Sequence, residues 1–309
     1  MDISVIICTH NRANLLKDAM SSVQSASAQS GLNLELLVID NASTDNTQSV
    51  VKDFKERCKD LSVNILFEHK LGKTYALNKA LINASGDILA LIDDDHIVNE
   101  GYLRAVCSAV EEHPSINLFC GRILPNWNGT EPQWVHDNKK YPIRPFPIPC
   151  FDLGDKAVRI DINRGAFLPG AGNLIIRKSV LEKIGFFSEL LGPKGHNLRG
   201  GEDIEFIRRA FGQGEGLLYV PEILQYHQVE QSNLSFYYVT KKAYLRSMAA
   251  NQFSNHYINI PFYLFRQAVD RFIKALFAVN KDARRYYLVK LAVTLGEMQG
   301  IRKSKNQNS

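Results

Sequence analysis

The chain has 309 residues, of which 45% are hydrophobic and 22% charged, a balance typical of a globular protein with a sizeable core. No stretch approaches the roughly 18–20 apolar residues of a membrane-spanning helix, and no basic leader precedes the first apolar run. The five cysteines are widely spaced and include no Cys-x-x-Cys pair, which argues against a disulfide frame or a zinc site. We therefore expect a reducing, cytoplasmic location.

The first part of the chain alternates strand-like and helix-like segments. Continuous apolar runs predict strands over 3–8, 34–40, 63–68, 87–93 and 117–124. Apolar residues at helical spacing predict helices over 11–26, 43–58, 73–84 and 101–113. Strands that are apolar throughout and alternate with helices indicate an α/β protein, with a parallel sheet covered on both faces.

Residues 126–168 interrupt this alternation. They are rich in proline and aromatic residues and too long for an ordinary connection, so we interpret them as a functional insertion. Strand and helix then return over 172–187, followed by a helix over 200–214 and a last strand over 217–230.

The C-terminal part of the chain is basic. Residues 239–309 contain 13 Lys and Arg against 3 Asp and Glu, whereas residues 1–238 contain 24 against 29. Apolar and aromatic residues recur at helical spacing over 236–301, with basic residues between them. Such helices suit the interface of an anionic membrane better than a nucleic acid. The alternative is that they pack on the rest of the chain and show a basic face to water.

Polar segments lie at the carboxyl ends of the first four predicted strands. They read THNR, DNASTD, EHKLGK and DDDH in chain order. Because the carboxyl ends of parallel strands share one edge, where ligands bind, we expect these segments to meet there. The adjacent carboxylates of Asp93, Asp94 and Asp95 repel one another. Either a cation lies among them, or they form a solvated acidic loop.

Four motifs in this order, VIICTHNR, LLVIDNASTDNT, GDILALIDDD and GGEDIEF, resemble those of the inverting family 2 glycosyltransferases. The resemblance covers about residues 1–230. It implies a GT-A fold over 1–235, with a Rossmann-like, mostly parallel sheet and helices on both faces. A nucleotide-sugar half would span 1–125 and an acceptor half 126–235, followed by a basic helical region over 236–309.

The resemblance also implies contacts to the nucleotide. Thr9 and Asn11 are candidates for the nucleobase, and Arg12 for the phosphates. Asp40 matches the acid that binds uracil or ribose. Many relatives have a second acid where this chain has Asn41, which leaves open which side chain takes the base edge. For CTHNR, the alternative is an ordinary strand-to-helix loop with Asn11 or Asn14 as the helix cap.

Phosphate and metal contacts are implied at the third and fourth strands. Lys73, at a helix start, would meet a phosphate, unless it is an ordinary exposed lysine. Asp93 would lie near the ribose and the metal, with Asp94 in support and Asp95 on the metal. His227 would lie near the metal or the diphosphate, or be structural. Hard oxygen ligands favour Mg²⁺ or Mn²⁺.

The GGEDIEF motif implies the catalytic acids. Inversion needs a general base for the acceptor hydroxyl, which would be Asp203, with Glu202 beside it. The alternative is that both acids only stabilise a helix N-terminus. Gly172 and Asn173 are candidate pocket residues. Trp127 and Trp134 either stack on sugars or form the core of the insertion.

The resemblance therefore implies transfer of a sugar from a nucleotide sugar, with UDP-sugars favoured, to a hydroxyl of a glycan or lipid-linked acceptor. We expect this activity on the cytoplasmic face of a membrane, with peripheral contact through 236–301 and no nucleic-acid partner. A nucleotidyltransferase is the first alternative, but CTHNRANLL lacks the Gly-rich loop that such enzymes carry after their first strand. The second is a non-catalytic binding protein, which the presence of every motif acid does not favour.

Overall fold

The computed structural model describes residues 2–136, 140–162, 168–193, 195, 200–252 and 259–307. Its contacts divide the chain into two compact units. The first contains the described residues within 1–126, 150–197 and 201–228, and the second those within 127–149, 198–200 and 229–309. The domain boundaries that we infer from the sequence, at 125/126 and 235/236, stay predictions.

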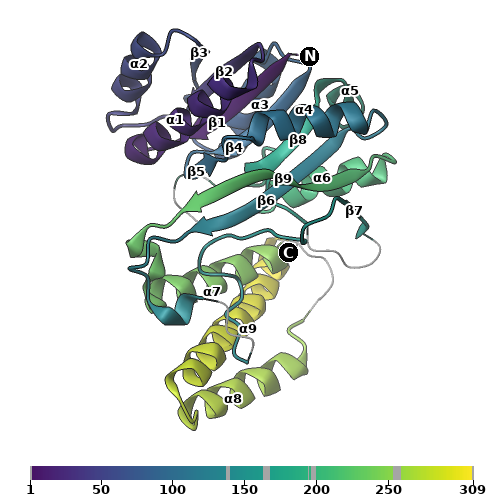
Figure 1. Ribbon diagram of the computed structural model, residues 1–309. Helices are drawn as coiled ribbons and strands as arrows, with labels where there is room; N and C mark the ends of the chain where they lie inside the picture. Colours follow the sequence, from purple (N-terminus) through teal and green to yellow (C-terminus); the bar gives the residue numbers. More distant parts are fainter. Residues whose placement is uncertain are drawn as a thin grey trace. The chain divides into compact units, whose positions relative to one another are not determined.

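The first unit is built on one β-sheet (Figure 1). Strands β1 (Ile3–Thr9), β2 (Leu34–Asp40), β3 (Ser62–Phe67) and β4 (Ile88–Asp93) run parallel in the order β3-β2-β1-β4. The sheet continues through β8 (Leu174–Arg177), β6 (Leu118–Asn126), β9 (Leu217–Gln228) and β5 (His96–Val98), and β7 (Val158–Ile160) also pairs with β9. Pairing in this second half is mixed, because β8 is antiparallel to β4 and β6.

Helices cover both faces of the sheet, as predicted. Helices α1 (Ala13–Ser30), α2 (Thr47–Arg57) and α4 (Tyr102–Glu112) share a buried cluster with one face. Helices α3 (Lys73–Asn83), α5 (Leu181–Ile184) and α6 (Glu202–Gly212) share a cluster with the other. Within β1, Val5 and Ile7 belong to the first cluster and Ile6 to the second, because successive side chains of a strand point to opposite faces. This explains why the strands are apolar without alternation.

The predicted segments differ from the structure mainly at the ends of helices. Helix α1 begins at Ala13 and not at 11, because Asn11 has a φ of 53° and belongs to the preceding turn. The sequence pattern does not reveal β5 or β7, since strands of three residues are too short to establish a period. Short 3-10 turns complete the first unit at Ala171–Asn173 and Lys178–Val180.

The second unit is mainly helical. It contains α7 (Phe236–Gln252), α8 (Phe262–Leu276) and α9 (Lys281–Gln307), with 3-10 turns at Gln133–Val135 and Gln231–Leu234. Trp134 packs edge-on against Phe236, and Trp127 packs against His136, with ring centroids 5.8 and 4.8 Å apart. These contacts favour a core role for both tryptophans. In the described part of the chain, no helix combines the length and apolarity needed to span a bilayer.

A bulge in β9 depends on Gly121. Gly121 pairs with Val220 and Arg122 pairs with Leu224, so three residues of β9 are left over between these pairs. A Cβ atom at Gly121 would collide with the carbonyl oxygen of Ile223 and approach Asn173 Nδ2 to 2.5 Å. The backbone itself occupies this space, so a side chain cannot be accommodated by a rotamer change.

We therefore expect Gly121→Ala to lower the free energy of unfolding by about 1–3 kcal/mol or more, as overpacking does. Gly212→Ala is the matched control, because a Cβ there meets nothing within 4 Å and alanine favours a helix. Urea titration of the two variants and the wild type measures the difference. Equal midpoints for Gly121→Ala and the wild type would contradict this reading of the bulge.

Candidate functional site

The predicted meeting of the strand ends is present in the structure. Thr9 pairs with Asp40 across β1 and β2, and Cys8 pairs with Asp93 across β1 and β4. Thr9, Asp40 and Asp94 are each at most 5% exposed. Side chains from the first, second and fourth strand ends thus lie at one edge of the sheet, largely shielded from water.

Each of the three consecutive carboxylates has a different set of partners. Asp93 accepts a short hydrogen bond from Lys73. Asp94 accepts from Thr9 Oγ1 at 2.8 Å and from Arg12 at 2.9 Å. Arg12 also donates to Asp95 at 3.0 Å. Lys73 and Arg12 therefore offset part of this negative charge from two sides.

Burial and charge act differently on the acids at the end of β4. Burial raises the pKa of Asp94 to about 6, against the opposing effect of Arg12. Burial also raises the pKa of Asp95, but His227, His96 and Arg12 outweigh it and hold that pKa well below its usual value. Asp95 is therefore the member of this group that stays ionised most readily.

Two histidines face Asp95. Nε2 of His227 lies 3.6 Å from Asp95 Oδ2, and Nε2 of His96 lies 3.8 Å from Asp95 Oδ1. The other ring nitrogen of His227 lies 2.8 Å from the carbonyl oxygen of Gln228. A carbonyl only accepts, so this nitrogen carries a proton, and in the neutral ring Nε2 presents a lone pair to Asp95. Burial also lowers the pKa of His227, against the opposing effect of Asp95.

The donor atoms of Asp95, His96 and His227 all lie within 4.8 Å of one another and could hold a metal ion. Carboxylate oxygen and neutral imidazole are ligands that Mn²⁺ accepts, so these residues fit the predicted metal. Asp93, the other predicted ligand, directs Oδ1 to Lys73, and its Oδ2 lies against Gly172. Sequence reasoning missed His96, although its position directly after the three acids was a signal.

Asn11 and Asn41 use their side chains to join loops. Asn11 Oδ1 accepts hydrogen bonds from the backbone of Thr44 and Asp45. The amide of Asn41 donates to the carbonyl oxygens of Glu68 and Lys70 and accepts from the backbone N–H of Gly72. Their predicted nucleotide contacts stay predictions.

One carboxylate oxygen of Asp40 is available to a ligand. Its Oδ1 accepts from the backbone N–H of Ser43 at 2.9 Å. Its Oδ2 is buried and has no hydrogen-bond partner among the described residues. A buried acceptor without a donor is costly, so this oxygen suits a ligand that brings an N–H or O–H group.

The acids of the GGEDIEF motif begin α6. Asp203 accepts from the backbone N–H of Ala171 at 3.3 Å and of Ile204 at 2.8 Å. Glu202 is 4% exposed, and its Oε2 has no partner in the described part of the chain. Burial raises the pKa of Glu202 to about 7, the charge of Asp203 adds to this, and Lys73 opposes it.

A short turn and one lysine connect these acids to the end of β4. A Cβ at Gly170 would lie 3.1 Å from Asp203 Oδ2, while one at Gly172 would collide with Asp93 Oδ2. The turn from Gly170 to Gly172 therefore touches both sets of acids. Burial lowers the pKa of Lys73, but Asp93 and Glu202 outweigh it and raise that pKa above its usual value.

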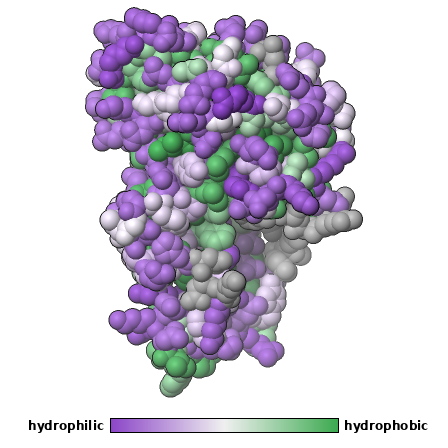
Figure 2. Space-filling model, in the orientation of Figure 1, coloured by the Kyte–Doolittle hydropathy of each residue, from purple (hydrophilic) through white to green (hydrophobic). Residues whose placement is uncertain are grey.

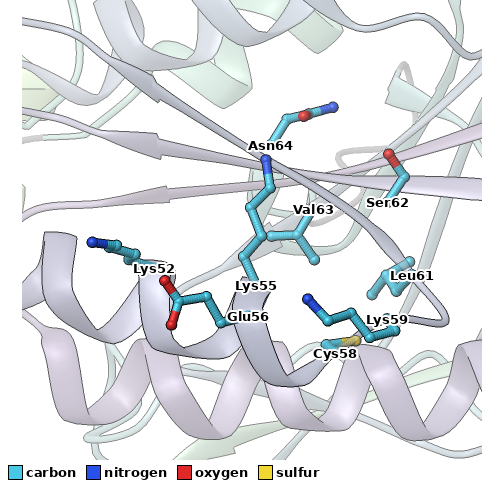
Figure 3. A pocket seen from close by; sticks show the side chains of 9 residues that line it. All are labelled: Lys52, Lys55, Glu56, Cys58, Lys59, Leu61, Ser62, Val63 and Asn64. Carbon is cyan, nitrogen blue, oxygen red and sulfur yellow. The ribbon is translucent and has the colours of Figure 1, made fainter.

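A separate pocket lies between the end of α2 and the start of β3 (Figure 3). It is lined by Lys52, Lys55, Glu56, Cys58, Lys59, Leu61, Ser62, Val63 and Asn64. None of the residues predicted for the site lines it. It lies at the amino end of β3, whereas the predicted site residues gather at the carboxyl ends of the strands.

Residues 4–185, more than half of the chain, match the model of the family Glycosyl transferase family 2. The chain therefore belongs to this family of glycosyltransferases, as its motifs predict. It is 21% identical over 237 residues to a glucosyl-dolichyl phosphate glucuronosyltransferase of Haloferax volcanii, covering 76% of this chain and 72% of that protein. It spans only about a third of the length of two other curated relatives, 36% of one and 35% of the other.

Solved glycosyltransferase structures share the fold. The mannosyltransferase PcManGT from Pyrobaculum calidifontis, in complex with GDP-Man and Mn²⁺, has a TM-score of 0.53 at 17% identity. That comparison covers 98% of this chain and 72% of the other. Residues 1–349 of S. aureus TarS, in complex with UDP-GlcNAc, also have a TM-score of 0.53 at 17% identity, with 100% and 93% covered. The predicted GT-A fold is thereby confirmed.

The raised pKa of Glu202 predicts a stability effect that depends on pH. A folded-state pKa of about 7, against the usual 4.5, means that the folded protein holds this proton more tightly than the unfolded chain. Wild-type stability therefore falls as the pH rises between these two values, by on the order of 1–3 kcal/mol. Glu202→Gln removes the ionisation and escapes this loss.

The measurement is the free energy of unfolding by urea titration, from about pH 4.5 to about pH 8. The difference between Glu202→Gln and the wild type should rise with pH and level off once the pH exceeds the folded-state pKa. Glu205→Gln is the matched control, because Glu205 begins the same helix but pairs with Arg209 at the surface. A pH-independent difference for Glu202→Gln would show that burial does not shift this acid.

Proposed function

We propose that the chain is a metal-dependent inverting glycosyltransferase, moving a sugar from a nucleotide sugar to a hydroxyl of a glycan or lipid-linked acceptor. One observation carries the proposal. The turn from Gly170 to Gly172 touches Asp93 on the metal side and Asp203 on the catalytic side. Asp93, which pairs with Lys73, and Asp203, which would take a proton, therefore both lie against one three-residue turn.

Asp95 and His227 would hold a divalent cation, which neutralises the charge of the departing diphosphate. Arg12 and Lys73 supply further positive charge at the same edge, paired now with Asp94, Asp95 and Asp93. Mn²⁺ or Mg²⁺ is the proposed cofactor. The carboxylate and imidazole donors support Mn²⁺, and so does the Mn²⁺ bound to PcManGT.

Asp203 is the proposed general base. It would take the proton of the acceptor hydroxyl while the oxygen forms its bond to the anomeric carbon. The bond to the diphosphate breaks on the opposite face, and its electrons leave with the diphosphate, so the configuration inverts. Glu202 has a raised pKa of about 7. In its protonated form it would donate a hydrogen bond to the acceptor.

Asp40 is the proposed contact to the base or ribose. Its free Oδ2 would accept from N3–H of uracil or from a sugar hydroxyl. TarS binds UDP-GlcNAc and PcManGT binds GDP-Man. We propose a UDP-sugar for this chain, with Thr9, Asn11 and Asn41 shaping the base site. The glucosyl-dolichyl phosphate named for the Haloferax relative supports a lipid-linked acceptor, as in polysaccharide or cell-envelope glycan assembly.

The experiment is a thermal-shift panel of UDP-, GDP- and dTDP-sugars with Mn²⁺, with and without chelator. A donor that binds the folded protein raises the midpoint by mass action. We expect one UDP-sugar to do so and the chelator to abolish the effect. Asp203→Asn should keep this shift and lose transfer by about 10²–10⁴-fold. Glu205→Gln, in the same helical turn, should keep both.

Retained transfer in Asp203→Asn would remove the base assignment. Donor binding without any turnover in the wild type would favour the non-catalytic alternative. Transfer that persists in the presence of chelator would contradict metal dependence.

Helix α8 supports peripheral contact with a membrane. Large apolar side chains form one stripe along it and are 46–76% exposed, at Phe262, Phe265, Val269, Phe272 and Leu276. The other side of the helix is already packed, because Leu264 and Ala275 are buried and Arg271 donates to the carbonyl oxygen of Lys290 in α9. Apolar atoms gather over the α8 end of the second unit (Figure 2).

The charge around this stripe favours an anionic lipid surface. Arg266, Lys281 and Arg284 are exposed on α8 and at the start of α9. Phe277 and Val279, which follow α8, are 80% and 96% exposed. A helix with an apolar stripe and basic flanks lies well in the interface of an anionic membrane. We propose that this surface holds the chain on the cytoplasmic face.

We expect Phe265→Ser with Phe272→Ser to weaken binding to vesicles of anionic lipid by about tenfold or more, because two apolar side chains no longer enter the interface. Co-sedimentation with anionic and neutral vesicles measures this. Ile82→Ser is the control, an equally apolar side chain that is 62% exposed on α3. If the double variant instead turns a wild-type dimer into a monomer in size-exclusion chromatography, the stripe joins two copies of the chain.

A further inference from the structure

We propose that His96 is a third protein ligand to the metal, and that a buried side-chain network fixes which of its ring nitrogens faces the metal. The inference rests on the proposed metal-dependent function. It adds a ligand that the sequence motifs do not imply, and places it beside Asp95 and His227.

The network starts from two backbone carbonyl groups. Asn173 Nδ2 donates to the carbonyl oxygens of Ile223 at 2.9 Å and Arg122 at 3.1 Å. Carbonyl oxygens only accept, so the amide nitrogen of Asn173 must face them. Its Oδ1 therefore faces the opposite way, toward Gln225.

The orientation of the Asn173 amide fixes that of the Gln225 amide. Gln225 Nε2 lies 2.9 Å from Asn173 Oδ1 and 3.2 Å from the hydroxyl of Tyr102. Because Asn173 Oδ1 can only accept, the amide nitrogen of Gln225 must face it. The oxygen Oε1 of Gln225 is then left to face His96. Asn173, Gln225 and Tyr102 are fully buried, so water does not compete for these bonds.

The orientation of Gln225 decides the tautomer of His96. Nδ1 of His96 lies 2.6 Å from Gln225 Oε1, and a proton on Nδ1 makes this a hydrogen bond. Nε2 then presents a lone pair, 3.8 Å from Asp95 Oδ1. Metal-binding histidines are oriented in this way, by a hydrogen bond from the nitrogen that does not bind.

Asp95 and the two histidines offer donor atoms that a cation could join, beside Arg12, which already donates to Asp95. Nε2 of each histidine lies 3.6 or 3.8 Å from a carboxylate oxygen of Asp95, which is too far for a hydrogen bond. Two ligands that each lie about 2.1 Å from one cation are at most about 4.2 Å apart. The separations of 3.6 Å from Asp95 Oδ2 to His227 and of 3.8 Å from Asp95 Oδ1 to His96 fall within that limit, while the donor atoms of all three residues lie within 4.8 Å, so the ion would draw them slightly closer together.

A donor set with two imidazoles has a consequence for metal choice. Mg²⁺ prefers oxygen ligands, whereas Mn²⁺ accepts imidazole nitrogen more readily. We therefore expect Mn²⁺ to bind more tightly than Mg²⁺, and His96 to contribute to that preference. A protein whose only imidazole ligand is His227 would discriminate less.

The test is pulsed EPR of Mn²⁺ bound to the wild-type chain, with ¹⁵N-labelled histidine. Two coupled imidazole nitrogens are expected. One coupled nitrogen would overturn the role of His96 while leaving the proposed function in place. Metal-independent transfer, measured on the same sample, would instead overturn the proposed function. This count of nitrogens needs no variant, so it does not depend on how a substitution folds.

Two variants extend the test. His96→Gln should weaken Mn²⁺ binding by at least about tenfold, measured from the EPR signal of free Mn²⁺, and narrow the preference for Mn²⁺ over Mg²⁺. His113→Gln, at the end of α4, is the control and should change neither. Circular dichroism in the presence of chelator checks that His96→Gln is folded. Unchanged Mn²⁺ affinity in folded His96→Gln would overturn the proposal.

Discussion

Repulsion among the three consecutive carboxylates at the end of β4 is the constraint around which the first unit is arranged. Strand β4 is apolar and buried up to Ile92, so the acids cannot all turn to open water. Their partners come from other strand ends, with Arg12 after β1 and Lys73 at the start of α3. The parallel order β3-β2-β1-β4 places these loops at one edge of the sheet, so the charge balance depends on the sheet topology.

The balancing charges divide the site into two halves. Lys73 pairs with Asp93 and acts on Glu202, whereas Arg12 pairs with Asp94 and Asp95. Asp95 also faces the histidines, so it belongs to the half that suits a cation. A phosphate group entering at this edge would compete with the carboxylates for Arg12 and Lys73. The ion pairs thus hold Arg12 and Lys73 in position at this edge of the sheet.

The sequence predicts those parts of the fold and site that depend on local pattern. Strand β2 spans the predicted 34–40, because a buried strand in a parallel sheet is apolar throughout. The convergence of Thr9, Asp40 and Asp93 follows from the same rule, since parallel strands place their carboxyl ends at one edge. A strand of three residues is too short to show a periodic pattern, so the sequence does not predict β5. The pairing of His96 with His227 across β5 and β9 is therefore not predicted either.

Other site features depend on contacts between distant residues. The sequence predicts nucleotide contacts for Asn11 and Asn41, which stay predictions, but it does not show that each amide also joins two loops. The orientation of His96 rests on Gln225 and Asn173, which are 129 and 77 residues further along the chain. Sequence motifs indicate the charged groups at strand ends. They do not indicate the neutral amides that fix the tautomer of His96.

Helix α8 shows that the sequence pattern alone does not separate buried from exposed apolar residues. Its sequence has apolar residues on more than one side, so the pattern alone cannot say which of them face a protein core. In the structure, Leu264 and Ala275 are buried while Phe262, Phe265 and Phe272 remain exposed. Residues 1–238 carry a net negative charge and residues 239–309 a positive one. In the proposed membrane contact, attraction to anionic lipid would therefore come from the same region that bears the exposed stripe.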